Sequence, residues 1–446
     1  MAGGKSRIRK AKTLASSALP APPLKESPAA DPAPVAVLTE DTLVVIFRRL
    51  TPAELLRAAL ACHRWRRAAV RPLPREPPVL GYFFHPAGVP DKPPLQPVDK
   101  TFYPAVFVPF EASSPRLSLA LPPGEMNSFS INEVHLGLVI LLPRNLPDAI
   151  LPRLLVVDPA SRRRALLPPP PRGALRDDRW RRDRKVFGVA VLSRAHPSRL
   201  SFDAVLFTVD GRRPRAWVAS VRDGDCTWRA MPRAEDVEVD FDPWWFEDRC
   251  VHAAGNIYWH ICNSGRALKL DPLTLDFSFI PVPAVLGDNW KSYRIGETLD
   301  GRLCIVVLVN EELQIWVRGE SRRSDRGWLL ETHMCVHKVL DTVPGLPGVG
   351  MKRDVSTWFT GMDFARTGKV FMRTWGYGRY SFHMETGKLE RLEMKDGKEW
   401  GHPIWAYTLA WPPAFLAPED QISGCSPVRE EISIANQLMS LRILDD

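Results

Sequence analysis

Apolar residues recur along the chain with two different periods, and the change between them divides it into two parts. In residues 38–70 the period is that of a helix, because Leu43, Ile46 and Leu50 are spaced three and four residues apart and fall on one helical face. Thr39 precedes two acidic residues and is the expected N-cap, since its hydroxyl can accept a hydrogen bond from the first turn. The pattern predicts a short first helix here.

A second helix is predicted to begin at Pro52. Thr51 and Glu54 have the spacing of a capping box, and proline is favoured at the first helical position. A third short segment follows and ends at Pro72, because proline cannot continue a helix. Three helices in about 35 residues are too small to be stable alone, so we expect their apolar faces to pack on a partner.

From Gly81 onward the pattern is that of β-strands. Short runs rich in Val, Ile, Phe, Trp and Leu alternate with turn pairs such as Asp210-Gly211 and Asp300-Gly301. Helical periodicity there never extends beyond two turns. The sequence therefore predicts a mainly β protein with a small helical unit at its N-terminal end.

The turns repeat at a regular spacing. Acidic turn residues at Asp158, Asp271 and Glu385 are separated by 113 and 114 residues, and Asp223 and Gly319 mark related units between them. The average repeat is about 57 residues, within the range of a propeller blade.

A second turn precedes three of these units, at Gly255, Gly301 and Gly368. Two hairpins per repeat make four strands, and a four-stranded unit of this size must stack against copies of itself to bury both faces. We therefore expect an antiparallel β-propeller of about six blades over residues 81–418, with five to eight blades compatible with the spacing.

The two ends of the chain differ in composition from this repeat region. Residues 1–37 are rich in Ala, Pro, Ser and Lys and are expected to be a disordered basic tail. Their basic cluster at residues 5–12 is open to three interpretations: a nuclear-import signal, an organelle transit segment, or a solubilising tail. Residues 419–446 are a polar tail in which Ile434 and Leu438 have the spacing of a short helix.

Charge is distributed unevenly. The 446 residues carry 60 Lys and Arg against 51 Asp and Glu, a formal charge of +9, but residues 1–80 hold 14 of the basic and six of the acidic residues. The remainder is nearly neutral, so nucleic acid is not an expected partner. The basic stretch 162–185 is read as a solvated loop, with a patch for an anionic partner as the alternative.

Apolar runs stay far below the roughly 18 residues needed to span a bilayer, and residues 1–36 contain no apolar signal region. We therefore expect a cytoplasmic or nuclear protein, or one found in both places, without a membrane partner. Its seven cysteines show no C-x-x-C spacing and are expected to be free thiols.

Motifs of catalytic sites are absent from the sequence: it contains no phosphate-binding loop, no G-x-S-x-G and no H-E-x-x-H. One group of metal-ligand residue types deserves weighing, because Cys250, His252, His260 and Cys262 flank a predicted turn at Gly255. That register places Cys250 opposite Cys262 and His252 opposite His260, which suggests zinc. Neighbouring strands hold such residues in a plane rather than around a point, so we expect core packing, with no metal and no cofactor.

A second group, His333, Cys335 and His337, alternates along one predicted strand and is likewise read as a strand face. Aromatic residues near predicted turns are candidates for contact with a partner, because exposed aromatics are frequent binding hot spots. These candidates for substrate binding are Trp244, Trp245, Trp375 and Tyr377. The alternative is that they pack between blades.

Residues 38–68 resemble an F-box, the motif that docks on the Skp-type adaptor of cullin-RING ubiquitin ligases. The positions that carry the resemblance, and to which it assigns adaptor binding, are Leu38, Leu43, Ile46, Leu50, Leu55, Leu56, Cys62 and Trp65. The sequence departs from the family at Thr39 and Thr51, where F-boxes usually have proline. Threonine also caps helices, so the resemblance implies a retained fold but leaves the affinity for the adaptor open.

The β region resembles the F-box-associated domains of flowering plants in its strand at 255–259, its hairpin at 293–304 and its closing segment at 411–416. The resemblance implies an F-box over residues 38–80 and a propeller over 81–418. It further implies a non-catalytic substrate-recognition subunit of an SCF-type E3 ubiquitin ligase.

Two other functions stay open from the sequence. One is a propeller interaction protein whose degenerate F-box acts outside a ligase. The other is a propeller enzyme, either a hydrolase or a sugar-binding enzyme. Such an enzyme would need polar groups clustered at one mouth of the central channel.

Overall fold

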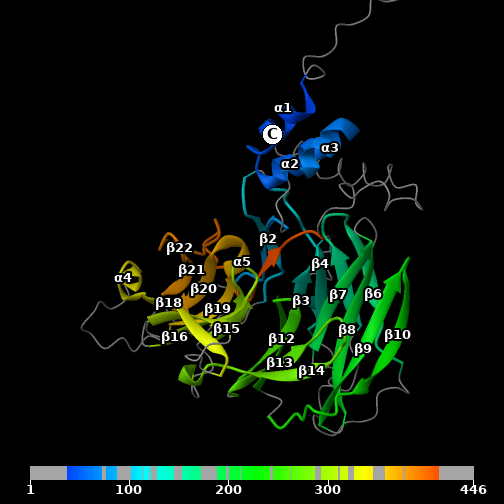
Figure 1. Cartoon of the computed structure of the whole chain (residues 1–446), viewed down its shortest axis with the longest axis vertical. Coiled ribbons are helices and arrows are strands. Elements are labelled where there is room, and N and C mark those ends of the chain that lie inside the picture. Colours follow the sequence, from blue (N-terminus) through cyan, green and yellow to red (C-terminus); the bar gives the residue numbers. More distant parts are fainter. Residues whose placement is uncertain are drawn as a thin grey trace, which may run out of the picture.

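The computed structural model of the chain consists of a small helical unit and a ring of β-sheets (Figure 1). The structure describes residues 38–410 except 73–76, 88–101, 113, 120, 122–127, 145–152, 172–187, 197–199, 211, 242–244, 263, 287–292, 310–311, 320–325, 345–356 and 375–376. The predictions for the tails at 1–37 and 419–446 and for the closing segment at 411–416 lie outside the described residues.

The helical unit contains the three predicted helices, α1 (Glu40–Phe47), α2 (Pro52–Ala61) and α3 (His63–Val70). Both predicted caps are present. The Thr39 hydroxyl accepts a hydrogen bond from the Thr42 amide at 3.2 Å. Thr51 accepts from the Glu54 amide at 3.3 Å while the Glu54 carboxylate accepts from the Thr51 amide at 2.9 Å, a complete capping box.

The predicted buried face of α1 is only partly correct. Leu43, Val44 and Phe47 form the buried face, whereas Ile46 is 41% exposed. Of the three residues in the predicted stripe, Ile46 is the one that points outward, because α1 packs against α3 along a row that includes Val44 and Phe47 in its place. Leu50 is half-buried against the same core.

Six antiparallel sheets form the ring, and five of them have four strands each in sequence order. The first of these five consists of β3 (Phe129–His135), β4 (Leu138–Pro143), β5 (Leu154–Asp158) and β6 (Arg163–Leu167). The next two are β7 (Gly188–His196), β8 (Ser201–Asp210), β9 (Arg213–Arg222) and β10 (Asp225–Arg233), and then β11 (Phe246–Ala253), β12 (Asn256–Ile261), β13 (Arg266–Leu270) and β14 (Phe277–Pro281). The last two are β15 (Tyr293–Glu297), β16 (Leu303–Val309), β17 (Glu312–Arg318) and β18 (Trp328–Cys335), and then β19 (Thr357–Asp363), β20 (Lys369–Thr374), β21 (Gly378–His383) and β22 (Leu389–Arg391).

The sixth sheet closes the ring with strands from both ends of the described chain. It consists of β23 (Ile404–Tyr407), β1 (Gly81–Phe84) and β2 (Val106–Pro109), in the order β2-β1-β23. Gly81 pairs with Tyr407, and Phe84 with Ile404, in an antiparallel register. The prediction of about six blades is confirmed.

The innermost strands complete a circle. β3, β7, β11, β15, β19 and β23 contact one another in that order, and β23 returns to β3. A ring of sheets that is closed in this way leaves only short, protected strand edges, and it surrounds a central channel.

The predicted repeat is confirmed by the positions of its turns. Asp223, Asp271, Gly319 and Glu385 lie between the third and fourth strands of their blades, and Asp158 is the last residue of the third strand of its blade. The glycines at 255, 301 and 368 lie between first and second strands and have positive φ, as tight turns require.

The core consists of apolar layers between neighbouring blades. In β5, Leu154 and Val156 pack against the β7–β10 blade, whereas Leu155 and Val157 pack toward the closing blade. Both faces of this strand are buried, which explains why it is a continuous apolar run in the sequence.

Two sequence interpretations need correction in this part of the chain. His337 begins the short helix α4 (His337–Leu340), so it does not alternate along a strand with His333 and Cys335. Arg162 lies in the β5–β6 turn, and β6 begins at Arg163, so the start of the predicted basic loop is a hairpin. Residues 172–187 of that stretch lie outside the described residues.

The helical unit lies against one end of the closing blade (Figure 1). Leu409, just after β23, packs against the helical core and also against the core between the closing blade and the β3–β6 blade. Leu409 is the propeller residue in the described helical core cluster, so the propeller supplies part of the partner expected for the apolar faces of the helices. In the part of the chain that is described, no helix is long and apolar enough to cross a membrane.

Candidate functional site

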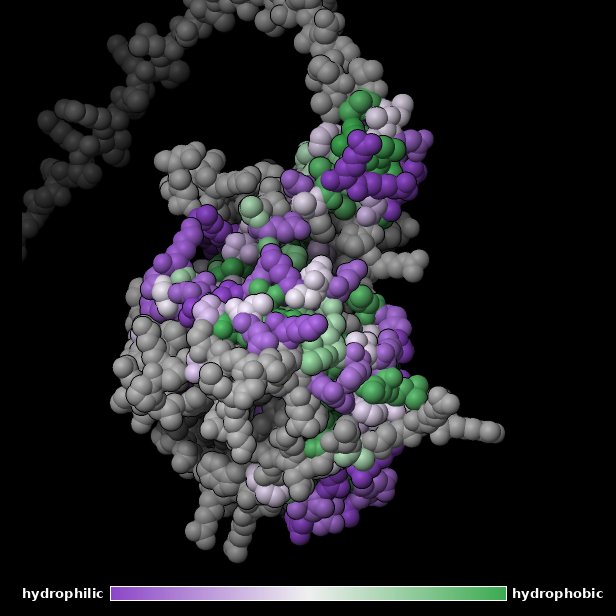
Figure 2. Space-filling model, turned by 90° about the vertical axis from the view of Figure 1, so that its left-hand side faces the viewer, coloured by the Kyte–Doolittle hydropathy of each residue, from purple (hydrophilic) through white to green (hydrophobic). Residues whose placement is uncertain are grey.

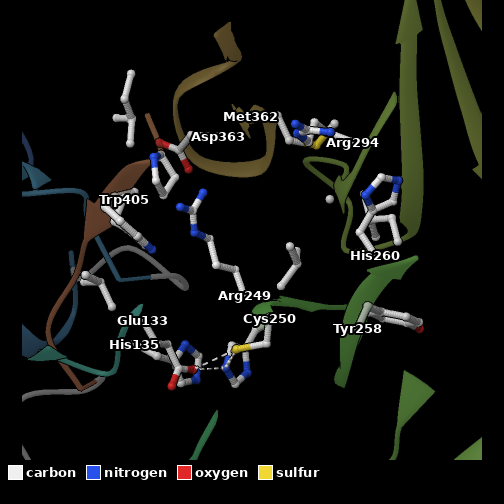
Figure 3. A pocket seen from close by; sticks show the side chains of 18 of the residues that line it. Glu133, His135, Arg249, Cys250, Tyr258, His260, Arg294, Met362, Asp363 and Trp405 are labelled. Carbon is white, nitrogen blue, oxygen red and sulfur yellow. Dashed lines mark hydrogen bonds and ion pairs between the residues drawn. The ribbon is translucent and has the colours of Figure 1, made fainter. Parts of the chain in front are cut away.

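The centre of the ring holds a cavity of about 210 Å³ (Figure 3). It is lined by residues of β3, β11, β12, β15, β19 and β23 and by Arg366 of the short helix α5 (Phe364–Thr367). Among its lining residues are four carboxylates, three arginines and four histidines. Ring closure thus brings together polar residues whose proximity could not be predicted from the sequence.

The first polar cluster of the wall is centred on Glu133 of β3. Its Oε1 accepts hydrogen bonds from His252 Nε2 at 2.6 Å and from Cys250 Sγ at 3.3 Å, and its Oε2 accepts from the Val191 amide at 2.8 Å. Glu133 is 3% exposed. A buried carboxylate needs such donors, and here it takes them from β7 and β11 and joins three blades.

His135 adds an aromatic contact to this cluster. Its ring stacks on His252 with centroids 3.6 Å apart and an interplanar angle of 6°. Burial, and then the neighbouring His252, lower the pKa of His135 well below its ordinary value. The stacked ring is therefore a neutral imidazole at physiological pH.

A second polar cluster lies on β11 and β12. Glu247 Oε1 is 3.3 Å from His260 Nδ1 and 3.9 Å from Cys262 Sγ, and the sulfur is 3.9 Å from the same imidazole nitrogen. Burial by itself raises the pKa of Glu247, but the hydrogen bond from His260 and the charge of Arg294 outweigh it and hold the pKa below its ordinary value. Burial, and then Glu247, raise the pKa of Cys262 to about 12.

Positive charge reaches the interior of the cavity from several strands. Arg249 extends from β11 toward the middle of the cavity, with Asp363 and Trp405 on one side of it (Figure 3). Asp363 accepts hydrogen bonds from the Tyr82 hydroxyl at 3.1 Å and the Thr367 hydroxyl at 2.9 Å. Burial raises the pKa of Asp363 against the opposing charge of Arg366.

All four carboxylates of the cavity accept hydrogen bonds from the protein. Glu297 accepts from the Ala254 amide at 2.9 Å. Glu133, Glu247 and Asp363 accept from the donors named above. Arg249 and Arg294 also line the cavity and bring guanidinium donors to it. The arrangement offers hydrogen-bond donors for a polar ligand and two groups of side chains that can ligate a metal.

The predicted ligand group does not form as the sequence suggested. The turn is Ala254-Gly255, so Cys250 pairs with Trp259 and His252 with Ile257. The predicted pairing of Cys250 with Cys262 is therefore wrong. The four residues separate into the two clusters, and each cluster gains a glutamate, Glu133 or Glu247, that sequence reasoning missed.

Those glutamates had no local signal in the sequence. Glu133 lies 119 residues before His252. Glu247 belongs to an irregular part of β11, where the register with β12 shifts between Phe246 and Cys250. Pairing across distant strands and a β-bulge both escape motif analysis.

The aromatic residues predicted to bind a substrate differ in exposure. Trp245 is 37% exposed and its carbonyl accepts a hydrogen bond from the Cys262 amide at 2.6 Å. Tyr377 is half-buried and packs on the core between the last two four-stranded blades, as the alternative reading expected. Trp244 and Trp375 lie outside the described residues.

The candidate adaptor-binding residues fall into three groups by exposure. Leu43, Leu55 and Leu56 are buried in the helical core; Leu38, Leu50 and Trp65 are half-buried; Ile46 and Cys62 are exposed. The buried leucines shape the fold of the helical unit and present no surface to a partner in this structure.

Sequence reasoning missed one exposed apolar residue beside Ile46. Val45 is 52% exposed and lies next to Ile46 on the outer face of α1. Val70, at the end of α3, is 46% exposed. Apolar surface is visible among charged surface on the helical unit (Figure 2), and such surface in a soluble protein is a candidate contact for a partner.

Comparison with known families finds two matches. The F-box-like family matches residues 40–75, and the family described as "F-box protein AT5G49610-like, beta-propeller" matches residues 153–415. The second match alone spans more than half of the chain. No curated protein matches the sequence.

Solved structures resemble the chain only weakly. TolB from Acinetobacter baumannii is 12% identical with a TM-score of 0.30, over 59% of this chain and 54% of TolB, so the chain spans about half of that protein. YCF48 bound to D1 peptide is 10% identical with a TM-score of 0.35, over 71% and 82%. The β-propeller domain of Cps50 (Swd1) from Myceliophteria thermophila is 12% identical with a TM-score of 0.31, over 65% and 79%. Similarities of this size carry no argument about function.

Proposed function

Because the chain belongs to the family of F-box proteins with an AT5G49610-like β-propeller, we propose that it is a substrate-recognition subunit of an SCF-type E3 ubiquitin ligase. In this proposal the F-box binds a Skp-type adaptor and, through it, a cullin-RING ligase. The propeller binds the protein to be ubiquitinated. The observation that carries the proposal is the succession of the two matched domains along one chain.

The proposed mechanism is proximity. An adaptor that holds a substrate next to a ubiquitin-loaded enzyme raises the effective concentration of the reacting groups. Such a role requires no bond chemistry from the chain itself, so we propose a non-catalytic subunit. It acts in the cytoplasm, the nucleus or both.

The contact proposed for the adaptor includes the exposed apolar pair on α1. Val45 and Ile46 are neighbours in the sequence and are 52% and 41% exposed, whereas Leu43 is 1% exposed. Burying apolar side chains of this size contributes about 1.5–3 kcal/mol each when burial is complete. The pair therefore supplies binding free energy that can be removed without disturbing the helical core.

The test is co-purification of the full chain with a Skp-type adaptor. We expect the double variant Val45→Asp/Ile46→Asp to lose adaptor binding at least tenfold, while its circular dichroism spectrum and melting temperature stay those of the wild type. The matched control is Leu273→Asp, because Leu273 is 91% exposed at a propeller turn. Adaptor binding that survives in the double variant would contradict the proposed contact.

The alternative of a degenerate F-box outside a ligase rests on the two threonines that replace proline. Both threonines cap their helices, and the helical unit is complete. These departures are therefore compatible with the helical fold, and the affinity for the adaptor is what the co-purification measures. A wild-type chain that fails to bind the adaptor would favour it.

A further inference from the structure

The cluster of Glu247, His260 and Cys262 has the geometry of a metal site. Glu247 Oε1 is 3.3 Å from His260 Nδ1. Cys262 Sγ is 3.9 Å from each of these two atoms. Bonds of about 2.0–2.3 Å to zinc place the ligand atoms of a tetrahedral site about 3.3–3.7 Å apart. The three atoms are thus already close to three corners of such a tetrahedron.

Strong hydrogen bonds do not account for this spacing. A charge-assisted N–H···O bond is typically about 2.7–2.9 Å long, which is shorter than the distance between Glu247 and His260. The sulfur is too distant from both neighbours for a strong bond. The Glu133 cluster is different, because its carboxylate accepts bonds of 2.6 and 2.8 Å from His252 and Val191 and forms a complete network.

His260 is oriented toward the cluster. The residue is 8% exposed, and its Nδ1 faces both the carboxylate and the sulfur. Its Nε2 has no hydrogen-bond partner among the described residues. The ring packs edge-on against Tyr293, with centroids 4.4 Å apart. Among the described residues, the polar contacts of this buried imidazole are therefore those with Glu247 and Cys262.

The sequence argument against zinc does not apply to this set of residues. It assumed four ligands spread over a regular hairpin. Here His260 lies near the end of β12 and Cys262 directly after it, and the register shift in β11 falls beside Glu247. A bulge redirects side chains out of the plane of the sheet, so the three donors surround a point instead of lying in a row.

We propose that Glu247, His260 and Cys262 bind a zinc ion in the wall of the propeller channel. Glu247 and His260 line the cavity, which leaves the fourth position for a water molecule. Binding releases the Cys262 thiol proton to solvent. The proton that His260 Nδ1 donates to Glu247 is given up and Nε2 carries the proton instead, which frees the Nδ1 lone pair for the ion. The carboxylate and the thiolate then balance the two charges of the ion, beside Arg294. The site does not depend on the proposed ligase function.

The experiment measures zinc in the purified full chain after incubation with Zn²⁺ and removal of unbound metal. We expect one zinc per chain in the wild type and less than a tenth of that in Cys262→Ala. Cys250→Ala is the matched control, because Cys250 belongs to the equivalent Cys and His pair of the Glu133 cluster. It is expected to keep one zinc per chain.

A measurement on the wild type alone protects the test against a variant that fails to fold. Replacing zinc by Co²⁺ is expected to produce thiolate-to-cobalt charge-transfer absorption, which reports a Co–S bond directly. A wild type without stoichiometric metal, or without this absorption, would overturn the proposal. Loss of zinc in Cys250→Ala with retention in Cys262→Ala would also overturn it, since the metal would then lie in the other cluster.

Discussion

The carboxylate of Glu133 on β3 lies 2.6 Å from the imidazole of His252 on β11, although 119 residues separate them in the chain. The other oxygen of Glu133 accepts a hydrogen bond from the Val191 amide of β7 at 2.8 Å. One buried side chain thus connects three successive inner strands of the propeller.

Replacing that carboxylate is expected to destabilise the ring. Glu133→Gln keeps the size of the side chain but removes its charge, so it weakens two hydrogen bonds to a charged acceptor. We expect the free energy of unfolding to fall by about 2 kcal/mol, measured by urea denaturation. The control is Glu312→Gln. In the wild type the Glu312 carboxylate lies 3.0 Å from His333 Nε2 in an exposed Glu–His pair, and its replacement should cost less than about 1 kcal/mol. Equal costs would contradict the role of Glu133.

Protonation of His85 is expected to couple stability to pH. Its Nε2 accepts a hydrogen bond from the Ile131 amide at 3.0 Å, and its Nδ1 donates to the Tyr103 carbonyl at 3.1 Å. The ring must be neutral to accept, and burial lowers the pKa of His85 to about 4. Between pH 6.5 and about 4 the unfolded chain binds the additional proton, so stability falls as the pH falls.

The variant His85→Gln tests this coupling, because glutamine can accept and donate at the same places without titrating. The wild type should lose up to about 1.4 kcal/mol more per pH unit than the variant across that window, measured by urea denaturation at pH 7, 6 and 5. His333→Gln, an exposed histidine, should retain the slope of the wild type. A wild-type slope in His85→Gln would refute the assignment.

Ring closure depends on a close approach at Gly401, just before β23. A Cβ atom at this position would overlap the backbone carbonyl oxygen of His85, just after β1. Gly401→Ala is therefore expected to cost about 3 kcal/mol of stability, as overpacking does in tight cores. At Gly265 the nearest atom to an added Cβ is Arg326 Nη1 at 3.6 Å, so Gly265→Ala should change the melting temperature little. A similar melting temperature for both variants would argue against this constraint.

The capping box is expected to stabilise α2 locally. Thr51→Ala removes the hydroxyl that accepts from the Glu54 amide and should cost about 1 kcal/mol. We expect hydrogen exchange of the α2 amides to accelerate about fivefold, the factor that corresponds to this energy. Thr227→Ala, in an exposed position on β10, should leave α2 unchanged. Unaltered exchange in Thr51→Ala would mean that the cap contributes nothing to the helix.

Sequence reasoning predicted the repeat architecture because its signals are local. The turn residues at Asp158, Asp271 and Glu385 recur at equivalent places in their blades, and turn chemistry acts over four residues. The helix caps at Thr39 and Thr51 are equally local, and both are present. Exposure was harder to predict, since Ile46 lies outside the stripe that α1 buries.

Which residues line the cavity could not be predicted from the sequence, for a different reason. Its residues come from strands that are distant in the chain, and their meeting depends on the closure of β23 onto β1. The predicted partners of Cys250 and Cys262 were wrong because a two-residue turn and a bulge changed the register by a few positions. A small change of register alters which side chains share a face.

Periodicity, capping and turn chemistry by themselves determined the three N-terminal helices and the four-stranded repeat of this protein, because each acts between residues that are near in the chain. They predicted about six blades, and the tertiary structure fixed the number at six. The tertiary structure alone decided which polar groups meet. Closing the ring buried Glu133 between three blades, and the irregular register of β11 placed Glu247 beside His260 and Cys262. Buried charges must find partners wherever the fold brings them, and only the closed ring defines those partners.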